Sequence, residues 1–293
     1  LAKETGLIQR QRRLTGASFV QSLVFGWLAN PEERLSGLAQ NTARVGPGIK
    51  PQSLEQRFTE KSVDFMREML RCAMQHALQA EAIEVELFKP FKAVRIADSS
   101  HLDIPCDFAE TYPGCGNQHG NSAGLKLQAN LDLVGGELRC ELQAGRESDH
   151  TSQVAFHCAK GELSVRDLGY FGVNHFEAIE TQGAYFLSRV PADHVFYDAE
   201  GQKLALHHYL QHGLEREVYL GKQHHFKVRL VVLKVPKAVR KQRIQRLYDE
   251  AKRKGRSVCA LALHLAGWDI RITNTSQALL PLEAVFVISR LRW

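Results

Sequence analysis

Two apolar runs that each lead into an aspartate are the feature that most limits what this chain can fold into. The first run, 94–97, leads to Asp98 within VRIADSSHLDIP, and the second leads to Asp167 within LSVRDLG at 163–169. An aspartate at the end of a buried strand lies at the rim of a sheet, a common place for ligands. Two such strands can bring two carboxylates to one edge, where their oxygens suit a hard divalent cation such as Mg²⁺. Either aspartate alone is equally well explained as a turn residue, so the surrounding sequence has to decide between the two interpretations.

The composition is that of a globular protein. The 293 residues are 44% hydrophobic and 24% charged, which leaves room for a sizeable core and more than one domain. No segment reaches the roughly 18 apolar residues of a membrane span, so we expect no membrane contact. The six cysteines form no Cys-x-x-Cys pair, which favours free thiols in a reducing, cytoplasmic setting.

The segment 1–88 is predicted to be helical. Apolar residues recur at helical spacing in SFVQSLVFGWLA and again over 62–80. Between these helices, short helices at 35–43 and 53–58 flank the turn VGPGIKP, which is the outline of a helix-turn-helix. Its second helix would offer Gln52, Ser53, Gln56 and Arg57 to double-stranded DNA. A plain helical bundle fits the same pattern.

The segment 89–191 changes to alternating strands and helices. We expect strands at 93–98, 125–133, 137–143, 163–167 and 184–190, and helices at 149–160 and 174–182. Three strands in a meander, followed by alternating helix and strand, predict an α/β fold with a mixed sheet. This is the order of the ribonuclease H-like core, whose first and fourth strands carry the first two metal-binding carboxylates. Asp98 and Asp167 fall on those two strands.

The segment 192–275 is predicted to be a β-rich insertion that interrupts this core. Its expected strands are VFYD, HHYL, EREVYL, HHFKVRLVVLKV and CALALHLA. The segment 276–293 then starts the last core helix. The expected divisions of the chain are therefore 1–88, 89–191, 192–275 and 276–293.

A basic helix is expected at 236–254, inside the insertion. Between 237 and 256 there are nine Lys or Arg and two acids, a local charge of +7 in a chain whose net charge is +6. Such a block can follow DNA phosphates without reading sequence. The residues expected to do so are Arg240, Lys241, Arg243, Arg246, Arg253 and Lys254. The alternative is a solvated helix face that binds nothing.

The chain resembles the DDE-type transposases of bacterial insertion sequences, in the subgroup with a β-rich insertion and a Tyr-Arg-Glu-Lys signature. The motifs that carry the resemblance are IADSSHLDIP, VRDLGYF, YFLSRV, WDIRITN and SRLRW. The resemblance itself extends over nearly the whole chain. Arg292 and Trp293 match the arginine and tryptophan of the signature, whereas Ser289 stands at its tyrosine position. The catalytic glutamate would fall three residues past Trp293. The resemblance thus implies a fragment that lacks the third carboxylate and is inactive alone.

The resemblance also implies phosphoryl transfer on DNA with two Mg²⁺ or Mn²⁺ ions held by Asp98 and Asp167. Water would first cut the element ends, and the freed 3′-hydroxyl would attack target DNA. Arg292 would pair with a backbone phosphate near the cut. Trp268 would stack on a displaced base, unless it is a strand residue packed in the core. A homodimer is expected because two element ends must be held together.

Other chemistry has weaker support. Five histidines of the insertion could form a metal cluster: His207, His208, His212, His224 and His225. Because no cysteine or acid accompanies them at ligand spacing, they make a poor metal site. Two rival functions stay open. One is a defective transposase remnant that binds element ends without cutting them, and the other is a ribonuclease H-like nuclease such as a junction resolvase. Metal-dependent nicking separates enzyme from binder, and strand transfer separates transposase from nuclease.

Overall fold

The computed structural model describes residues 1–10, 13–30, 32–46, 48–78, 86–116, 122–192, 194–205, 210–223 and 225–291, with backbone alone for 74–78. The chain divides into two compact units, Leu1–Glu81 and Ala82–Trp293. Within the described ranges, no helix is both long and apolar enough to cross a lipid bilayer.

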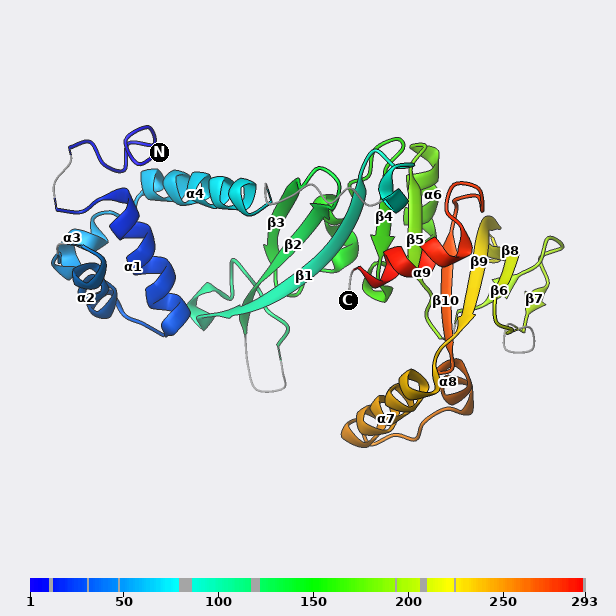
Figure 1. Ribbon diagram of the computed structural model, residues 1–293. Helices are drawn as coiled ribbons and strands as arrows, with labels where there is room; N and C mark the ends of the chain where they lie inside the picture. The colour runs from blue at the N-terminus through cyan, green and yellow to red at the C-terminus, as the bar shows by residue number, and fades with distance from the viewer. Residues whose placement is uncertain are drawn as a thin grey trace. The chain divides into compact units, whose positions relative to one another are not determined.

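The first unit is built from four helices in its described part: α1 Gly16–Ala29, α2 Leu35–Val45, α3 Pro51–Glu55 and α4 Glu60–Leu78 (Figure 1). Helix α1 starts at a capping box, in which the side chains of Thr15 and Ser18 each accept a hydrogen bond from the other's backbone N–H. Its buried face places Phe19 in a core with Leu38 and Phe65.

The second unit is organised around one mixed sheet (Figure 1). Its strands are β1 Val94–Ile104, β2 Ala123–Asp132, β3 Leu138–Ala144, β4 Leu163–Arg166, β5 Tyr185–Arg189, β6 Phe196–Tyr197, β7 Lys203–Leu204, β8 Leu214–Leu220, β9 Phe226–Lys234 and β10 Trp268–Thr273. They lie in the order β3-β2-β1-β4-β5-β10-β9-β8-β6-β7. Strands β1, β4 and β5 run parallel, and the other neighbours are antiparallel. The predicted α/β class with a mixed sheet is confirmed.

The described helices of the second unit are α5 Gln153–Phe156, α6 Val173–Thr181, α7 Lys237–Arg253, α8 Ala260–Leu265 and α9 Leu282–Arg290, with short 3₁₀ turns η1 Glu86–Phe88, η2 Cys106–Phe108, η3 Asp149–Thr151 and η4 Leu168–Tyr170. Helices α6 and α9 cover the two faces of the sheet. Phe176 of α6 packs with Phe186, whereas Val285 of α9 shares a core with Leu187. Because successive strand residues point to opposite faces, α6 and α9 lie on opposite sides of the sheet.

Several segments differ from the predicted secondary structure. The helix expected at 149–160 is reduced to η3 and α5, because Ser152 has extended backbone and its side chain caps α5. CALALHLA contains helix α8 instead of a strand, since a short apolar run fits either structure and Ala and Leu favour helix. Most of HHYL lies outside the described residues. The first strand continues past 98 to Ile104, so Asp98 lies within a strand and not at its end.

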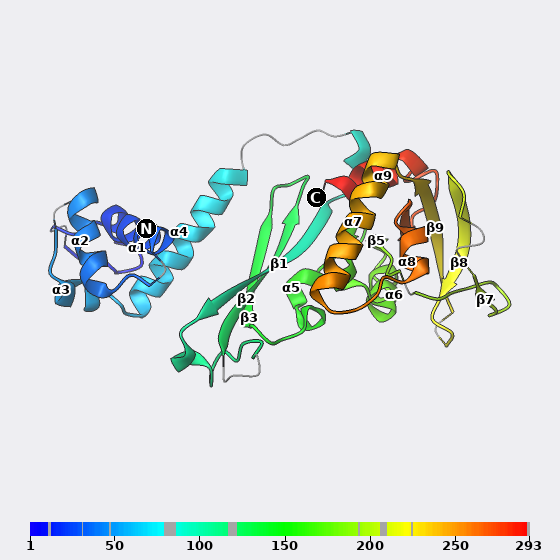
Figure 2. The same cartoon turned by 90° about the horizontal axis from the view of Figure 1, so that it is seen from below.

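The expected insertion at 192–275 continues the core sheet. Strand β10 pairs with β5, and β9 and β8 follow it outward. Helices α7 and α8 project from the end of the sheet where β9 stops and β10 begins, as Figures 1 and 2 show from two directions. The basic helix predicted at 236–254 is therefore present as α7.

Helix α7 is anchored to the sheet through Arg243. Its Nη2 donates to Oδ1 of Asp269 at 2.6 Å, and its Nη1 donates to the carbonyl of Trp268 at 3.0 Å. The Asp269 side chain is 13% exposed and that of Arg243 is 34% exposed. The pair is thus shielded from water more than an ordinary surface ion pair.

We predict that Arg243→Met loosens α7 without unfolding the sheet. The change removes both contacts, so we expect a stability loss of about 1 kcal/mol and faster hydrogen exchange of α7 amides. Lys241→Met, on the exposed side of the same helix, is the matched control and should change stability by less than about 0.5 kcal/mol. Equal exchange rates in the two variants would contradict this role of Arg243.

A buried ion pair braces the start of the sheet. Arg95 donates from Nε to Glu162 Oε2 at 2.6 Å and from Nη2 to Glu162 Oε1 at 2.9 Å. The two side chains are 4% and 10% exposed. Hydrogen bonding from Arg95 holds the pKa of Glu162 below its usual value, although burial acts in the opposite direction. The pair ties β1 to the turn that precedes β4.

We predict that Glu162→Gln destabilises the second unit by about 3 kcal/mol at neutral pH, because it leaves the buried Arg95 charge poorly compensated. Since the folded pKa of Glu162 is lowered, its contribution is complete above the unfolded value of about 4.3 and is lost as pH falls through the folded value. Urea unfolding of wild type and variant should therefore converge as the pH falls through the lowered folded pKa of Glu162. A gap that stays constant with pH would rule out the ionised pair as its source.

Candidate active site

The register of the parallel strands brings Asp98 and Asp167 together. Strand β1 pairs with β4 as Val94↔Leu163 and Ile96↔Val165, and the residue numbers in each pair differ by 69. Asp98 and Asp167 also differ by 69, so the same register, continued two residues past its last pair and one residue past the end of β4, puts them opposite each other. Neighbouring strands are about 4.8 Å apart. A continued register would therefore bring the two predicted carboxylates to neighbouring positions.

The same row continues across two more strands. Strand β4 pairs with β5 as Arg166↔Ser188, which places Arg189 opposite Asp167, and β5 pairs with β10 as Arg189↔Arg271. Residues in register on adjacent strands point to the same face. We call Asp98, Asp167, Arg189 and Arg271 the charged row. It carries two acids and then two bases across β1, β4, β5 and β10.

The two ends of the charged row differ in burial. Asp98 is exposed, Asp167 and Arg189 have side chains 26% and 39% exposed, and Arg271 is 9% exposed. Helix α9 covers the basic end, where Arg271 Nε donates to Ser289 Oγ at 3.2 Å and the guanidinium lies 5.8 Å from the Phe286 ring centroid. The acidic end is the part that a ligand in solution can reach.

An ion pair joins the two halves of the charged row. Nη1 of Arg189 donates to Oδ1 of Asp167 at 3.3 Å. Asp98 Oδ1 accepts a hydrogen bond from the backbone N–H of Ser99 at 2.8 Å. Arg189 thus neutralises part of the negative charge next to the exposed Asp98 carboxylate.

Arg271 carries its charge in an unfavourable setting. Burial lowers its pKa to about 10, and the nearby Arg189 and Arg243 act in the same direction. Asp269, whose Oδ1 lies 3.7 Å from Arg271 Nη1, opposes the change. Asp269 is also the anchor of α7, so one carboxylate connects the basic helix with the charged row.

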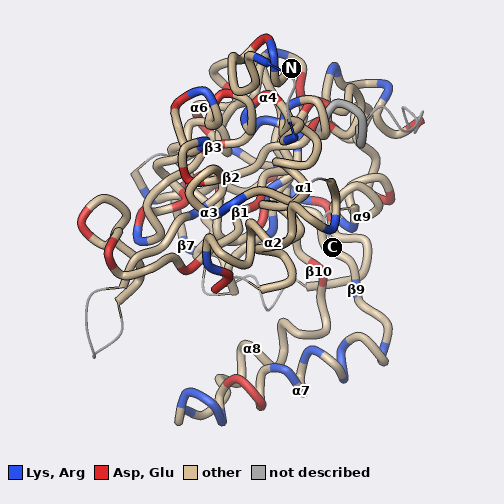
Figure 3. The backbone as a smooth tube through the Cα atoms, turned by 90° about the vertical axis from the view of Figure 1, so that its left-hand side faces the viewer, with Lys and Arg blue, Asp and Glu red and all other residues tan. Residues whose placement is uncertain are grey.

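The basic helix presents only part of its predicted set to solvent. Figure 3 shows Lys and Arg along α7, and Lys241, Arg246 and Arg253 are exposed. Arg243 instead holds Asp269, and Lys254 pairs with Glu250 at 2.5 Å. Arg240 is exposed, but its side chain packs over Gly267: a Cβ added at Gly267 would lie 3.4 Å from Cδ of Arg240.

The other predicted DNA-binding residues belong to both units. Trp268 is half-buried at the start of β10, where Lys234 Nζ lies 5.9 Å from its ring centroid. In the first unit, Gln56 is exposed, whereas half-buried Arg57 donates to the Leu7 carbonyl at 3.2 Å. Arg292 lies outside the described residues, as do Trp293, His207, His208 and His224.

The described histidines of the suggested metal cluster have other contacts. Nδ1 of His212 accepts a hydrogen bond from the backbone N–H of Lys234 at 3.3 Å, and His225 stacks on Tyr219 at 4.0 Å. Across the described part of the chain, no group of three or more His, Cys, Asp or Glu side chains is placed to hold a metal ion. Asp98 and Asp167 therefore supply two carboxylates, which fits a hard cation that takes its other ligands from water and phosphate.

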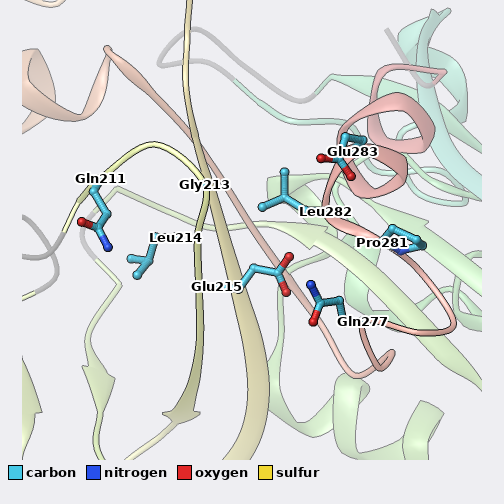
Figure 4. Close-up of a pocket in the computed structure, with 8 residues that line it drawn as sticks. All are labelled: Gln211, Gly213, Leu214, Glu215, Gln277, Pro281, Leu282 and Glu283. Carbon is cyan, nitrogen blue, oxygen red and sulfur yellow. The ribbon is translucent and has the colours of Figure 1, made fainter.

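A polar hollow of about 450 Å³ lies apart from the charged row, at the N-terminal end of α9 (Figure 4). Its walls are Gln211, Gly213, Leu214, Glu215, Gln277, Pro281, Leu282 and Glu283. Glu215 is paired with Arg229 at 3.0 Å. None of the charged row lines this hollow.

Arg189 and Arg271 are the site residues that the sequence did not reveal. Both lie in motifs noted for other reasons, YFLSRV and WDIRITN. A basic residue within each strand-like run was the available signal. Its meaning depends on strand register, which sequence patterns do not specify.

The chain is similar to known transposases along its whole length. Residues 89–293 match the family described as the transposase DDE domain. The transposase for insertion sequence element IS231B of Bacillus thuringiensis subsp. berliner is 27% identical over 323 residues, covering 100% of this chain and 67% of the relative. The transposase for element IS1151 of Clostridium perfringens is 23% identical over 320 residues, with the same coverage.

Among solved structures, a piggyBac transposase synaptic complex with hairpin DNA aligns with a TM-score of 0.37 and 9% identity, covering 94% of this chain and 56% of that one. The family match spans well over half of the chain. The chain therefore belongs to the family of transposases with a DDE domain.

Proposed function

We propose that this chain carries the catalytic core of a transposase that cuts DNA at the ends of a mobile element and joins those ends to target DNA. The observation that supports the proposal is the parallel register of β1 and β4, which brings Asp98 opposite Asp167 when it is continued two residues past its last pair. The acidic end of the charged row, which holds these two residues, is accessible to a ligand. The order of strands supports a ribonuclease H-like core, in which two carboxylates on adjacent strands bind metal.

Asp98 and Asp167 would hold the divalent cations, Mg²⁺ or Mn²⁺. When bound, such ions supply charge neutralisation on the phosphate and activation of the attacking oxygen. Arg189 and Arg271 add positive charge on the β5 and β10 side of the carboxylates. A DNA phosphate bound here would therefore have the two arginines on one side and the metal-binding carboxylates on the other.

Helix α7 would hold the DNA backbone beside the charged row. The antiparallel pairing of β5 with β10 puts Arg189 at the same end of the sheet as Trp268, where the α7–α8 projection begins. Exposed Lys241, Arg246 and Arg253 would contact phosphates, and half-exposed Trp268 would be available to stack on a base. The helices of the first unit, with Gln56 and Arg57, would recognise element ends, and two copies would hold the two ends.

A second candidate function is DNA binding without cleavage. It is favoured by one observation, that the described residues place no third acidic or histidine ligand beside Asp98 and Asp167. A ribonuclease H-like nuclease that cuts without joining is a further alternative. Nicking assays distinguish the first alternative from the proposal, and assays for strand transfer to a second DNA distinguish the second.

We predict that, in a full-length version that carries the third carboxylate, Asp98→Asn and Asp167→Asn each reduce Mn²⁺-dependent nicking of DNA by about a hundredfold or more, because a neutral amide is a poor ligand for a hard cation. Binding of the same DNA should stay within about twofold of wild type, since phosphate contacts from α7 are retained. The measurements are nicking of DNA that carries the element ends and gel-shift titration of the same duplex. Wild-type nicking rates in either variant would refute the assignment.

We predict that the double variant Lys241→Gln, Arg246→Gln lowers the salt dependence of DNA affinity. Each lost phosphate contact reduces the slope of log affinity against log salt by about 0.9, so the slope should fall by about 1.8. The matched control is Lys160→Gln, Lys222→Gln. It removes two exposed charges near the starts of β4 and β9, at the opposite end of the sheet. If both variants change the slope equally, α7 is not the DNA-binding element.

A further inference from the structure

Arg189 stands between two groups of opposite charge. On one side its Nη1 binds Oδ1 of Asp167 at 3.3 Å, and on the other it lies in register with Arg271. Like charges directly opposite on adjacent strands repel. The placement of Arg189 therefore depends on an anion on the β4 side.

Arg271 has no comparable freedom. Its guanidinium donates to Ser289 Oγ at 3.2 Å and to the Ile270 carbonyl at 2.9 Å, and it lies 3.7 Å from Asp269 Oδ1. It is 9% exposed and packs against Phe286 of α9. Arg189, whose side chain is 39% exposed, is therefore the arginine with room to point away from the other, toward Asp167 and solvent.

The Asp167–Arg189 pair is suited to exchange. Both side chains are partly exposed, and exposed ion pairs contribute little to stability, so separating them costs little. A guanidinium donates paired hydrogen bonds to a carboxylate or to a phosphate equally well, and it stays charged at any ordinary pH. A divalent cation on Asp167 would compete directly with Arg189 for the same carboxylate oxygens.

We propose that Arg189 is a phosphate-binding residue of this site with two anionic partners. It holds Asp167 when that carboxylate has no divalent cation, and it binds a DNA backbone phosphate when a cation occupies Asp167. The inference rests on the proposed function, because it takes Asp167 as a metal ligand. Arg271 positions Arg189 by repulsion and does not touch the DNA itself.

The proposal predicts two effects of Arg189→Gln in the full chain. Without DNA, Mn²⁺ titrated against the protein and followed by electron paramagnetic resonance should bind about two- to fivefold more tightly than to wild type, because a competing cation is gone. With a blunt-ended mixed-sequence duplex and Ca²⁺ as the divalent cation, the salt slope of DNA binding should fall by about 1. With the duplex but no divalent cation, the slope should not change.

Arg189→Lys keeps the charge and serves as a second variant. It should restore most of the Ca²⁺-dependent salt slope but bind DNA more weakly than wild type, because the bidentate fork is lost. Lys241→Gln is the matched control, since a phosphate contact from α7 should lower the slope with and without Ca²⁺ alike. Circular dichroism of each variant verifies that it is folded.

The outcomes separate this inference from the proposed function. If wild type binds Mn²⁺ through Asp98 and Asp167 but Arg189→Gln changes neither affinity nor slope, the role of Arg189 is overturned and the metal site stands. A slope change of equal size with and without Ca²⁺ also overturns the exchange of partners. If wild type binds no Mn²⁺, or if Asp98→Asn and Asp167→Asn leave its Mn²⁺ binding unchanged, both proposals are wrong.

Discussion

The pairing of β1, β4 and β5 in parallel sets the position of every charged group at the proposed site. The register of these strands, continued past the end of β4, would put two aspartates and an arginine on one line, and the antiparallel β10 adds a second arginine. A shift of one residue in any pair would turn one of these side chains to the opposite face. The apolar residues that precede each charged group prevent that shift, because Val94, Leu163 and Leu187 must all face the α9 core.

Helix α9 and the α7–α8 projection act on this line from different sides. Helix α9 buries the basic end of the charged row and fixes Arg271 through Ser289. Helix α7 is tied to the same place through Arg243 and Asp269. Asp269 contacts both Arg243 and Arg271, so the helix proposed to bind DNA and the row proposed to bind metal are held by the same carboxylate. A change in how α7 is held would therefore reach the site through Arg271.

Much of this arrangement follows from sequence patterns. The α/β class, the two acid-bearing strands and the basic helix were all predicted, because apolar runs of strand length and a dense basic block are local signals. Arg189 and Arg271 were not predicted as a pair, since they lie 82 positions apart and meet only through sheet register. The strand expected in CALALHLA was wrong because the short run of Ala and Leu carries no period that distinguishes helix from strand. Arg243 was expected on DNA, and it is half-buried because its position on α7 faces β10.

The most direct test of this account is the anomalous scattering of Mn²⁺ in a crystal of the protein. The account predicts a peak within coordination distance of carboxylate oxygens from both Asp98 and Asp167, with the Arg189 guanidinium moved off Asp167. A peak at other residues, or none at a Mn²⁺ concentration that supports nicking, would contradict the central claim that the aligned carboxylates form the metal site.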